Sequence, residues 1–269
     1  MRAIAAIAVA STLALAACNT TAVTEGLVLD KAQGSAANIA SLSAVVKSNP
    51  RDPQAWNTRG AAYGQAGQFT KALADFDQAL ALDSRFASAY VNRGLVKQRT
   101  GRGADAIADY NRALQIDPQN DEALVGRGHV YFYAGQDRQA FTDYNRAVKL
   151  DTTNPRAYYN RGLILQRRSR HDDAIEDFAK AISFADKTAQ PYNARGLSYL
   201  ALGRTNNALD DFNAALQLDS RYAEAWTNQA LVYEKRGDRK RAFKSYSRAA
   251  QLKPKYTPAR DGMSRTRGA

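Results

Sequence analysis

Residues 56–79 read WNTRGAAYGQAGQFTKALADFDQA, and the skeleton of this stretch returns every 34 residues along the chain. Units of this length begin at Pro53, Ala87, Asp121, Pro155, Ala189 and Ala223. A fixed period of this size is typical of solenoid proteins, in which each unit stacks only on its neighbours. The chain of 269 residues is therefore predicted to form one elongated domain rather than several compact ones.

Each unit has the pattern of two antiparallel helices joined by a tight turn. In the first unit the helices are expected over 53–66 and 69–82, with Gly67 between them, where a helix end favours positive φ. Small residues recur in both helices, and Phe76 or its equivalent fills the space that they leave. The aromatic stripe is thus predicted to be core, not a cofactor site.

Trp56, Gly60, Tyr63, Ala72, Phe76 and Ala79 fit the pattern W-x2-L-G-x2-Y…A-x3-F, so the chain resembles the tetratricopeptide repeat family. The resemblance implies an all-α fold, a right-handed helical solenoid of about six 34-residue helix-turn-helix repeats with capping helices. The repeats would be 53–86, 87–120, 121–154, 155–188, 189–222 and 223–256. An N-terminal capping helix is expected within 35–52, and a C-terminal capping helix and tail within 257–269.

One departure from the family pattern is regular. The leucine before the glycine is replaced in five repeats, by Arg59, Arg93, Arg127, Arg161 and Arg195. An aspartate follows each arginine sixteen residues later: Asp75, Asp109, Asp143, Asp177 and Asp211. The sixth repeat carries Gln229 and Ser245 instead, so both members change together. This pattern predicts an ion pair between the two helices of each of the first five repeats.

The first residues resemble the signal of a bacterial lipoprotein. Residues 3–17 are uncharged and mostly apolar, too short for the ~20 residues of a membrane-spanning helix and suited to a secretory signal. They end in Leu15-Ala16-Ala17-Cys18, which resembles a lipobox. The resemblance implies a lipoprotein signal peptide over 1–17, acylation of Cys18, and a flexible tether over 18–34. Ordinary cleavage after Ala16 is the alternative, since Ala14-Leu15-Ala16 also fits the A-x-A pattern.

The lipobox also bears on location. In lipoproteins of enteric bacteria an aspartate after the cysteine retains the protein at the inner membrane, and this chain has Asn19 there. The resemblance therefore implies a Gram-negative cell envelope, with the chain lipid-anchored, facing the periplasm and attached to the outer membrane. Cys18 would supply the membrane contact, and nucleic acid is not an expected partner.

The family resemblance also assigns a partner-binding groove to the first helices of the repeats. The residues expected in or beside this groove are Asn92, Gln98, Arg99, His129, Phe132, Tyr133, Arg156, Tyr159, Asn160, Gln166 and Arg167. Arginine offers a forked donor to carboxylates, and aromatic rings give rigid contact area. The carboxylate clamp of the family is missing from this chain. Val91, Val125 and Tyr159 stand at the place of its lysine, and its asparagine is absent as well. An acidic or amphipathic peptide or helix is the expected ligand, and a solvated basic face without a ligand is the alternative.

The formal net charge is +12, and the last 47 residues hold twelve basic and four acidic side chains. A basic patch is expected there from Lys235, Arg236, Arg239, Lys240, Arg241, Lys244 and Arg248. Such a patch is usually a solvated face; beside a membrane it could bind anionic lipid or lipopolysaccharide.

The sequence contains no phosphate-binding loop, nucleophile elbow, zinc-protease motif or dinucleotide fingerprint. With one cysteine and two histidines, a usual zinc site cannot be assembled, so neither a metal nor a cofactor is expected. The prediction is a non-enzymatic, lipid-anchored periplasmic scaffold or adaptor that binds proteins through its groove, in envelope assembly or maintenance. The alternative is a membrane-facing structural stabiliser that uses the basic C-terminal face.

Overall fold

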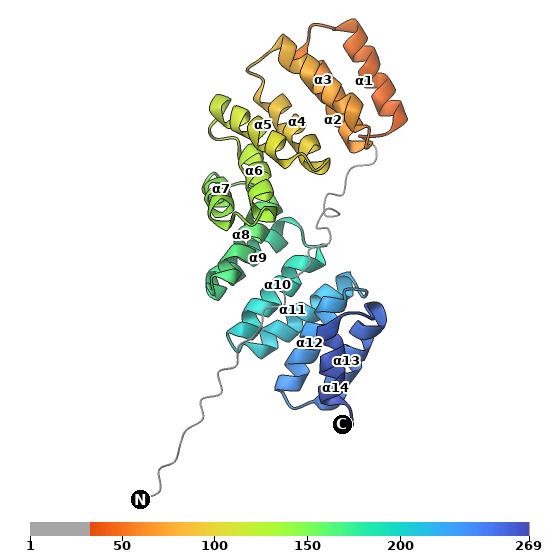
Figure 1. The fold of residues 1–269 in the computed structure, drawn as a ribbon, viewed down its shortest axis with the longest axis vertical. Helices are drawn as coiled ribbons and strands as arrows, with labels where there is room; N and C mark the ends of the chain where they lie inside the picture. Colours follow the sequence, from red (N-terminus) through yellow and green to blue (C-terminus); the bar gives the residue numbers. More distant parts are fainter. Residues whose placement is uncertain (1–32, 269) are drawn as a thin grey trace, which may run out of the picture.

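The structure is a computed structural model that describes residues 33–268, and this range folds into helices without any strand (Figure 1). The helices are α1 (Ala36–Ser48), α2 (Pro53–Gln65), α3 (Phe69–Leu82), α4 (Ala87–Arg99), α5 (Gly103–Ile116), α6 (Asp121–Tyr133), α7 (Asp137–Lys149), α8 (Pro155–Arg167), α9 (His171–Phe184), α10 (Ala189–Ala201), α11 (Thr205–Leu218), α12 (Ala223–Lys235), α13 (Arg239–Leu252) and α14 (Thr257–Thr266). The predicted all-α solenoid is confirmed.

The helices stack as consecutive pairs along a curved array, with α1 at one end and α13 and α14 at the other (Figure 1). The first helices of successive repeats, α2, α4, α6, α8, α10 and α12, each contact the next in that series. The second helices of successive repeats make no such contacts within residues 33–268. The first helices therefore lie closer together and line the inner side of the curve.

Capping residues and glycines set the helix ends. Asp52 caps α2 by accepting a hydrogen bond from the Gln54 backbone N–H at 2.9 Å, and Pro53 occupies the first turn. Gly67, at the turn between α2 and α3, has φ +73°, and the glycines at the same place in four other repeats are also positive. Ser169 takes this conformation in the fourth repeat, at φ 58°.

Glycine and aromatic residues fit together inside each of the first five repeats. The Phe178 ring is fully buried, and a Cβ added at Gly162 would lie 2.7 Å from its Cε1. The pair Gly60 and Phe76 has the same geometry, also at 2.7 Å. Since packed carbons do not approach so closely, glycine is required where α8 crosses this ring.

The predicted ion pairs are confirmed in all five repeats. Each arginine donates from Nε and Nη2 to the two carboxylate oxygens of its aspartate; in the first repeat, Arg59 reaches Asp75 at 2.7 and 2.8 Å. The four other pairs have the same arrangement. The aspartates are 3–5% exposed, so the pairs join the two helices inside the repeat.

The sixth repeat keeps the connection without the charges. Ser245 Oγ donates to Gln229 Oε1 at 2.7 Å, and Gln229 Nε2 donates to Asn213 Oδ1 of the preceding repeat at 2.7 Å. Both residues are buried and neutral. The joint substitution thus replaces an ion pair by a hydrogen-bonded pair.

The ends of the array are covered by α1 and α14. Ser35 caps α1 by accepting from the Asn38 backbone N–H at 3.2 Å. At the other end Arg265 of α14 binds Glu234 of α12 at 2.9 Å. Helices long and apolar enough to cross a membrane are absent from residues 33–268. The predicted signal peptide, Cys18 and most of the tether lie outside the described residues.

Candidate functional site

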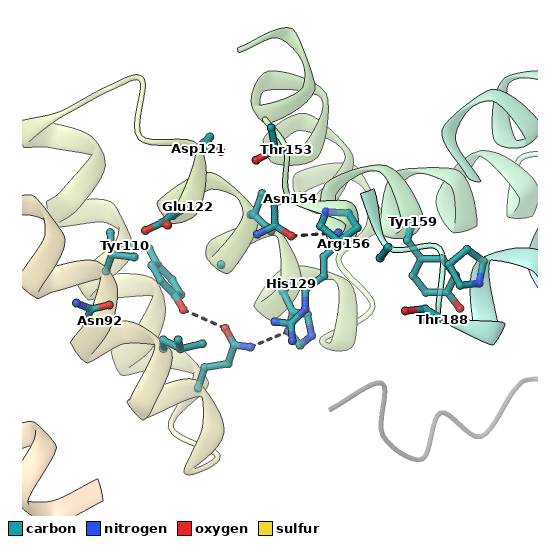
Figure 2. Close-up of a pocket in the computed structure, with 18 of the residues that line it drawn as sticks. Asn92, Tyr110, Asp121, Glu122, His129, Thr153, Asn154, Arg156, Tyr159 and Thr188 are labelled. Carbon is teal, nitrogen blue, oxygen red and sulfur yellow. Dashed lines mark hydrogen bonds between the residues drawn. The ribbon is translucent and has the colours of Figure 1, made fainter. Parts of the chain in front are cut away.

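A pocket of about 610 Å³ opens between α4, α6 and α8, on the inner side of the array (Figure 2). The loops before α8 and α10 close its far side. Its lining residues are Val91, Asn92, Leu95, Gln98, Tyr110, Asp121, Glu122, Val125, Gly126, His129, Thr153, Asn154, Pro155, Arg156, Tyr159, Ala185, Thr188, Gln190 and Pro191. Three consecutive repeats and the start of a fourth contribute, so the pocket exists only in the stacked array.

A relay of hydrogen bonds fixes one wall. The Tyr110 hydroxyl donates to Gln98 Oε1 at 3.1 Å, and Gln98 Nε2 lies 2.9 Å from His129 Nδ1 (Figure 2). Because the Gln98 amide donates to Nδ1, the neutral imidazole carries its proton on Nε2. Burial, and then the charge of Arg156, lower the pKa of His129 to about 4. His129 is therefore a neutral donor at pH 7.

Two arginines beside the pocket have no acidic partner. The side chains of Arg99 and Arg156 make no ion pair or hydrogen bond among the described residues, although both are partly buried. Burial lowers the pKa of both guanidinium groups, and the charge of Arg99 lowers that of Arg156 further. Two like charges without a counter-ion create a local demand for an anion.

Two acidic residues also line the pocket. Asp121 accepts a hydrogen bond from the Thr152 hydroxyl, whereas the Glu122 carboxylate has no such bond among the described residues. Burial, and then neighbouring Asp121, raise the pKa of Glu122. Glu122 and Arg156 hold the same place in consecutive repeats, so the pocket presents a free carboxylate and a free guanidinium one repeat apart.

Gly126 explains why the pocket forms at this repeat. The Tyr110 ring lies so close to Gly126 that an added Cβ would be 2.5 Å from Cζ. In the next repeat the equivalent residue is Asn160, which is buried and donates to the Tyr144 hydroxyl at 3.0 Å. Glycine leaves the Tyr110 hydroxyl free to reach Gln98. Sequence reasoning missed Gly126 and Tyr110; the signal was a glycine outside the repeat pattern.

The structure brings five of the eleven predicted groove residues into the pocket: Asn92, Gln98, His129, Arg156 and Tyr159. Asn92 also donates to Asn57 Oδ1 of the preceding repeat at 3.0 Å. Arg99 stands close to Arg156 without lining the pocket. Glu122, Tyr110 and Gly126 join the site beyond the sequence prediction.

The other predicted groove residues have different roles. Asn160 belongs to the core, because its amide is held by Tyr144. Gln166 donates to Ser198 Oγ at 2.8 Å, joining adjacent repeats. Arg167 pairs with Asp137 at 2.6 Å.

The two predicted aromatic groove residues also lie outside the pocket. The Phe132 ring is buried beneath the guanidinium of Arg167, whose Cζ lies 4.6 Å from the ring centroid. The Tyr133 ring is exposed beside His129, with the two centroids 4.5 Å apart.

The predicted basic patch lies at the other end of the array, on the last residue of α12, the turn after it and α13, with all seven cations exposed. Arg241 pairs with Asp238, and Arg236 donates to Asn206 Oδ1. Lys244 and Arg248 line a second pocket, between α12 and α13. Over residues 33–268, groups of acidic, histidine or cysteine side chains that could hold a metal ion are absent.

Family models match most of the repeat array. Two models described as tetratricopeptide repeat match residues 57–121 and 193–257, and residues 154–221. A third, described as TPR repeat, matches residues 128–169. No curated protein matches the chain.

Solved structures share the fold. The chain is similar to YrrB, described as a TPR protein with an unusual peptide-binding site, at 21% identity and a TM-score of 0.63 over 70% of this chain and 97% of YrrB. It is similar to PilF of Pseudomonas aeruginosa at 19% identity and a TM-score of 0.71, over 79% of this chain and 97% of PilF. A third similar structure is MamA, at 28% identity and a TM-score of 0.55 over 61% of this chain and 96% of MamA.

Proposed function

The chain belongs to the tetratricopeptide repeat family, a family of protein-interaction scaffolds, and from that premise we propose that it is a lipid-anchored adaptor of the bacterial cell envelope. It carries no chemistry of its own. The inner surface of the array captures an extended peptide or helix of a protein partner, and the pocket between α4, α6 and α8 receives an acidic side chain of that partner.

The unpaired guanidinium groups of Arg99 and Arg156 carry this proposal. A carboxylate in the pocket accepts from Arg156 and from the Nε2–H of neutral His129, and its charge offsets the repulsion between the two arginines. A basic side chain on the same peptide pairs with Glu122, one repeat away. The rings of Tyr110 and Tyr159 supply contact area.

The binding experiment uses arrayed peptides that contain Asp or Glu, beside matched peptides with Asn or Gln. We expect the full chain to prefer the acidic set and the variant Arg99→Gln with Arg156→Gln to lose that preference. The matched control is Arg138→Gln with Arg221→Gln, which removes two exposed charges away from the pocket. Equal binding of acidic and amide peptides by the wild-type chain would refute an acidic ligand.

Lipid anchoring and envelope location are part of the proposal. Support comes from the lone Cys18 after Leu15-Ala16-Ala17 and from Asn19 beside it. Metabolic labelling with palmitate should label the wild-type chain and leave Cys18→Ser unlabelled; label that persists in Cys18→Ser would refute acylation at Cys18. Fractionation should place the protein in the outer membrane and move Asn19→Asp to the inner membrane.

A further inference from the structure

In the first and fifth repeats, the first helix carries two aromatic residues seven positions apart, and an arginine side chain fills the space between their rings. In the first repeat the Arg59 guanidinium carbon lies 4.9 Å from the Trp56 ring centroid and 5.7 Å from that of Tyr63. In the fifth repeat Arg195 stands 5.7 and 6.0 Å from the rings of Tyr192 and Tyr199. In both, the guanidinium is stacked between two rings and held by its aspartate.

The sixth repeat keeps the two rings and lacks the repeat's arginine, while the Arg241 guanidinium of α13 lies over one of the rings, 4.7 Å from the Tyr233 centroid. Trp226 and Tyr233 occupy the ring positions, but Gln229 is shorter than arginine and turns to Ser245 and Asn213. A second pocket, of about 720 Å³, lies there and is lined by Trp226, Gln229, Tyr233, Arg241, Phe243, Lys244, Ser245, Ser247, Arg248 and Gln251. The repeat that lacks the Arg–Asp ion pair therefore also has an open pocket beside its two aromatic rings.

The hollow is lined by three cations, of which Arg241 pairs with Asp238 and the other two are unpaired. Lys244 and Arg248, one helical turn apart on α13, make no ion pair or side-chain hydrogen bond among the described residues. The Ser247 hydroxyl, which lines the same pocket, is buried and has no hydrogen-bond partner. Residues 239–255 contain no acidic side chain. Two cations and a free hydroxyl at one opening provide donors for an anion.

The aspartate of the other repeats would oppose such an anion. In the sixth repeat its place is taken by neutral Ser245, and the residues that line the pocket include no carboxylate. The pair Gln229 and Ser245 has the same net charge as Arg and Asp, which means that the change opens space and removes a fixed negative group without altering the total charge. An anionic head group can then enter between the rings.

The pocket also faces away from the peptide groove. It uses the fourth, seventh and eleventh residues of α12, whereas the earlier first helices line the groove pocket mainly with their second, fifth, sixth, ninth and twelfth residues. Residues three to four apart share a face of a helix, so these two sets lie on different faces. A ligand here leaves the groove free.

A membrane surface suits this face better than a point ligand. Lys240, Lys244 and Arg248 are exposed at four-residue spacing and form a cationic line along α13. A line of one charge sign complements an extended anionic surface, because each Lys or Arg beside such a surface adds a favourable electrostatic attraction. Trp and Tyr rings favour the level of the lipid head groups.

We propose that the hollow between Trp226 and Tyr233 binds the phosphate head group of an anionic lipid, with Lys244 and Arg248 holding the phosphate. The site is independent of the groove and of the acidic ligand proposed there. It places the C-terminal end of the array against the membrane surface.

The decisive variant restores the arrangement of the other repeats: Gln229→Arg with Ser245→Asp. The new guanidinium fills the slot between the rings and pairs with the new carboxylate, while net charge and the exposed cations stay the same. Thermal unfolding should show a fold at least as stable as that of the wild-type chain. A second variant, Lys244→Gln with Arg248→Gln, removes the rim charges, and the control Lys235→Gln with Lys255→Gln removes two exposed charges outside both the pocket lining and the cationic line on α13.

Binding is measured by flotation with vesicles of phosphatidylcholine alone and of phosphatidylcholine with phosphatidylglycerol. All chains carry Cys18→Ser, so that no acyl chain contributes, and binding to neutral vesicles is the common baseline. We expect the anionic vesicles to bind the wild-type chain at least about tenfold more tightly than the restored-pair variant or the Lys244 and Arg248 variant. The control with Lys235 and Lys255 replaced should retain most of the binding.

Four outcomes would overturn the proposal. Undiminished binding of the restored-pair variant would mean that surface charge alone attracts the vesicles. An equal loss in the Lys235 and Lys255 control would mean the same. Competition by soluble glycerol phosphate as effective as that by vesicles would assign the pocket to a free phosphate ester, and preferential binding of polyglutamate through Lys244 and Arg248 would assign it to an acidic protein.

Discussion

Arg127 of α6 and Asp143 of α7 are joined by two parallel hydrogen bonds, from Nε at 2.9 Å and from Nη2 at 2.7 Å. The carboxylate is 3% exposed, and its hydrogen bonds raise the pKa of Arg127 against the opposing effect of burial. Arg127 Nη1 also donates to Asn111 Oδ1 of the preceding repeat at 2.6 Å. One guanidinium thus ties two helices and two repeats together.

Removing either partner should destabilise the array. Arg127→Ala or Asp143→Ala leaves an uncompensated buried group, and each should lower the free energy of unfolding by about 3–5 kcal/mol. The double variant should lose less than the sum, which chemical denaturation of all four chains would measure as a coupling energy. The same double-mutant cycle on the exposed pair Arg102 and Asp105 is the control, and its coupling energy should be under ~1 kcal/mol. Zero coupling between Arg127 and Asp143 would contradict a structural role for the pair.

A methyl group at Gly162 should be costly. The new Cβ of Gly162→Ala would lie 2.7 Å from Phe178 Cε1, and the fully buried ring has no free space to move into. We expect a loss of about 1–3 kcal/mol in the free energy of unfolding, measured by urea denaturation. Gly103→Ala is the control, because its Cβ would meet only Val130 at 3.3 Å. Equal stability of Gly162→Ala and wild type would show that the helices separate easily.

Lowering the pH should destabilise the folded chain, because the partly buried His129 resists protonation. Its pKa is about 4 in the folded chain and about 6.5 when unfolded, so the unfolded chain binds the extra proton between these values. Stability is therefore complete above pH ~6.5 and falls as the pH drops toward ~4, by at most about 3 kcal/mol. His129→Gln should remove this part of the pH dependence of unfolding. Proton titration by NMR should also show the pKa of His129 rise when an acidic peptide binds; an unchanged pKa would place the peptide elsewhere.

Replacing Arg156 should stabilise the free protein and weaken its binding of acidic peptides. Its guanidinium is partly buried beside Arg99 without a counter-ion, so Arg156→Gln removes a repulsion and should raise the melting temperature of the free protein. The same change should weaken acidic-peptide binding and reduce the stabilisation that the peptide confers. Arg138→Gln, a single exposed charge on α7, should alter neither property. A lower melting temperature for Arg156→Gln would mean that the charge is already compensated.

The candidate site was predictable only in part. Gln98, His129 and Arg156 could be placed in one groove because each holds a position in the first helix of its repeat that faces the groove in the family. Asn160 could not be placed correctly, since its role depends on whether the ring of the preceding repeat carries a hydroxyl, as Tyr144 does. Arg99 and Arg156 matter to the site because neither contacts an acidic side chain. The sequence does not show this, because the spacing of residues within one repeat does not say which side chains meet between repeats.

The sequence by itself determined the architecture, because a 34-residue period of small and aromatic residues is a local pattern that each repeat satisfies with its own two helices. It also determined the five Arg–Asp pairs, whose partners are always sixteen residues apart within one repeat. Only the tertiary structure decided where the surface is hollow. Gly126 opens the groove pocket by making room for a ring from another repeat, and Gln229 leaves a slot between Trp226 and Tyr233. Both pockets depend on the volume left between helices after packing, which residue spacing along the chain does not encode.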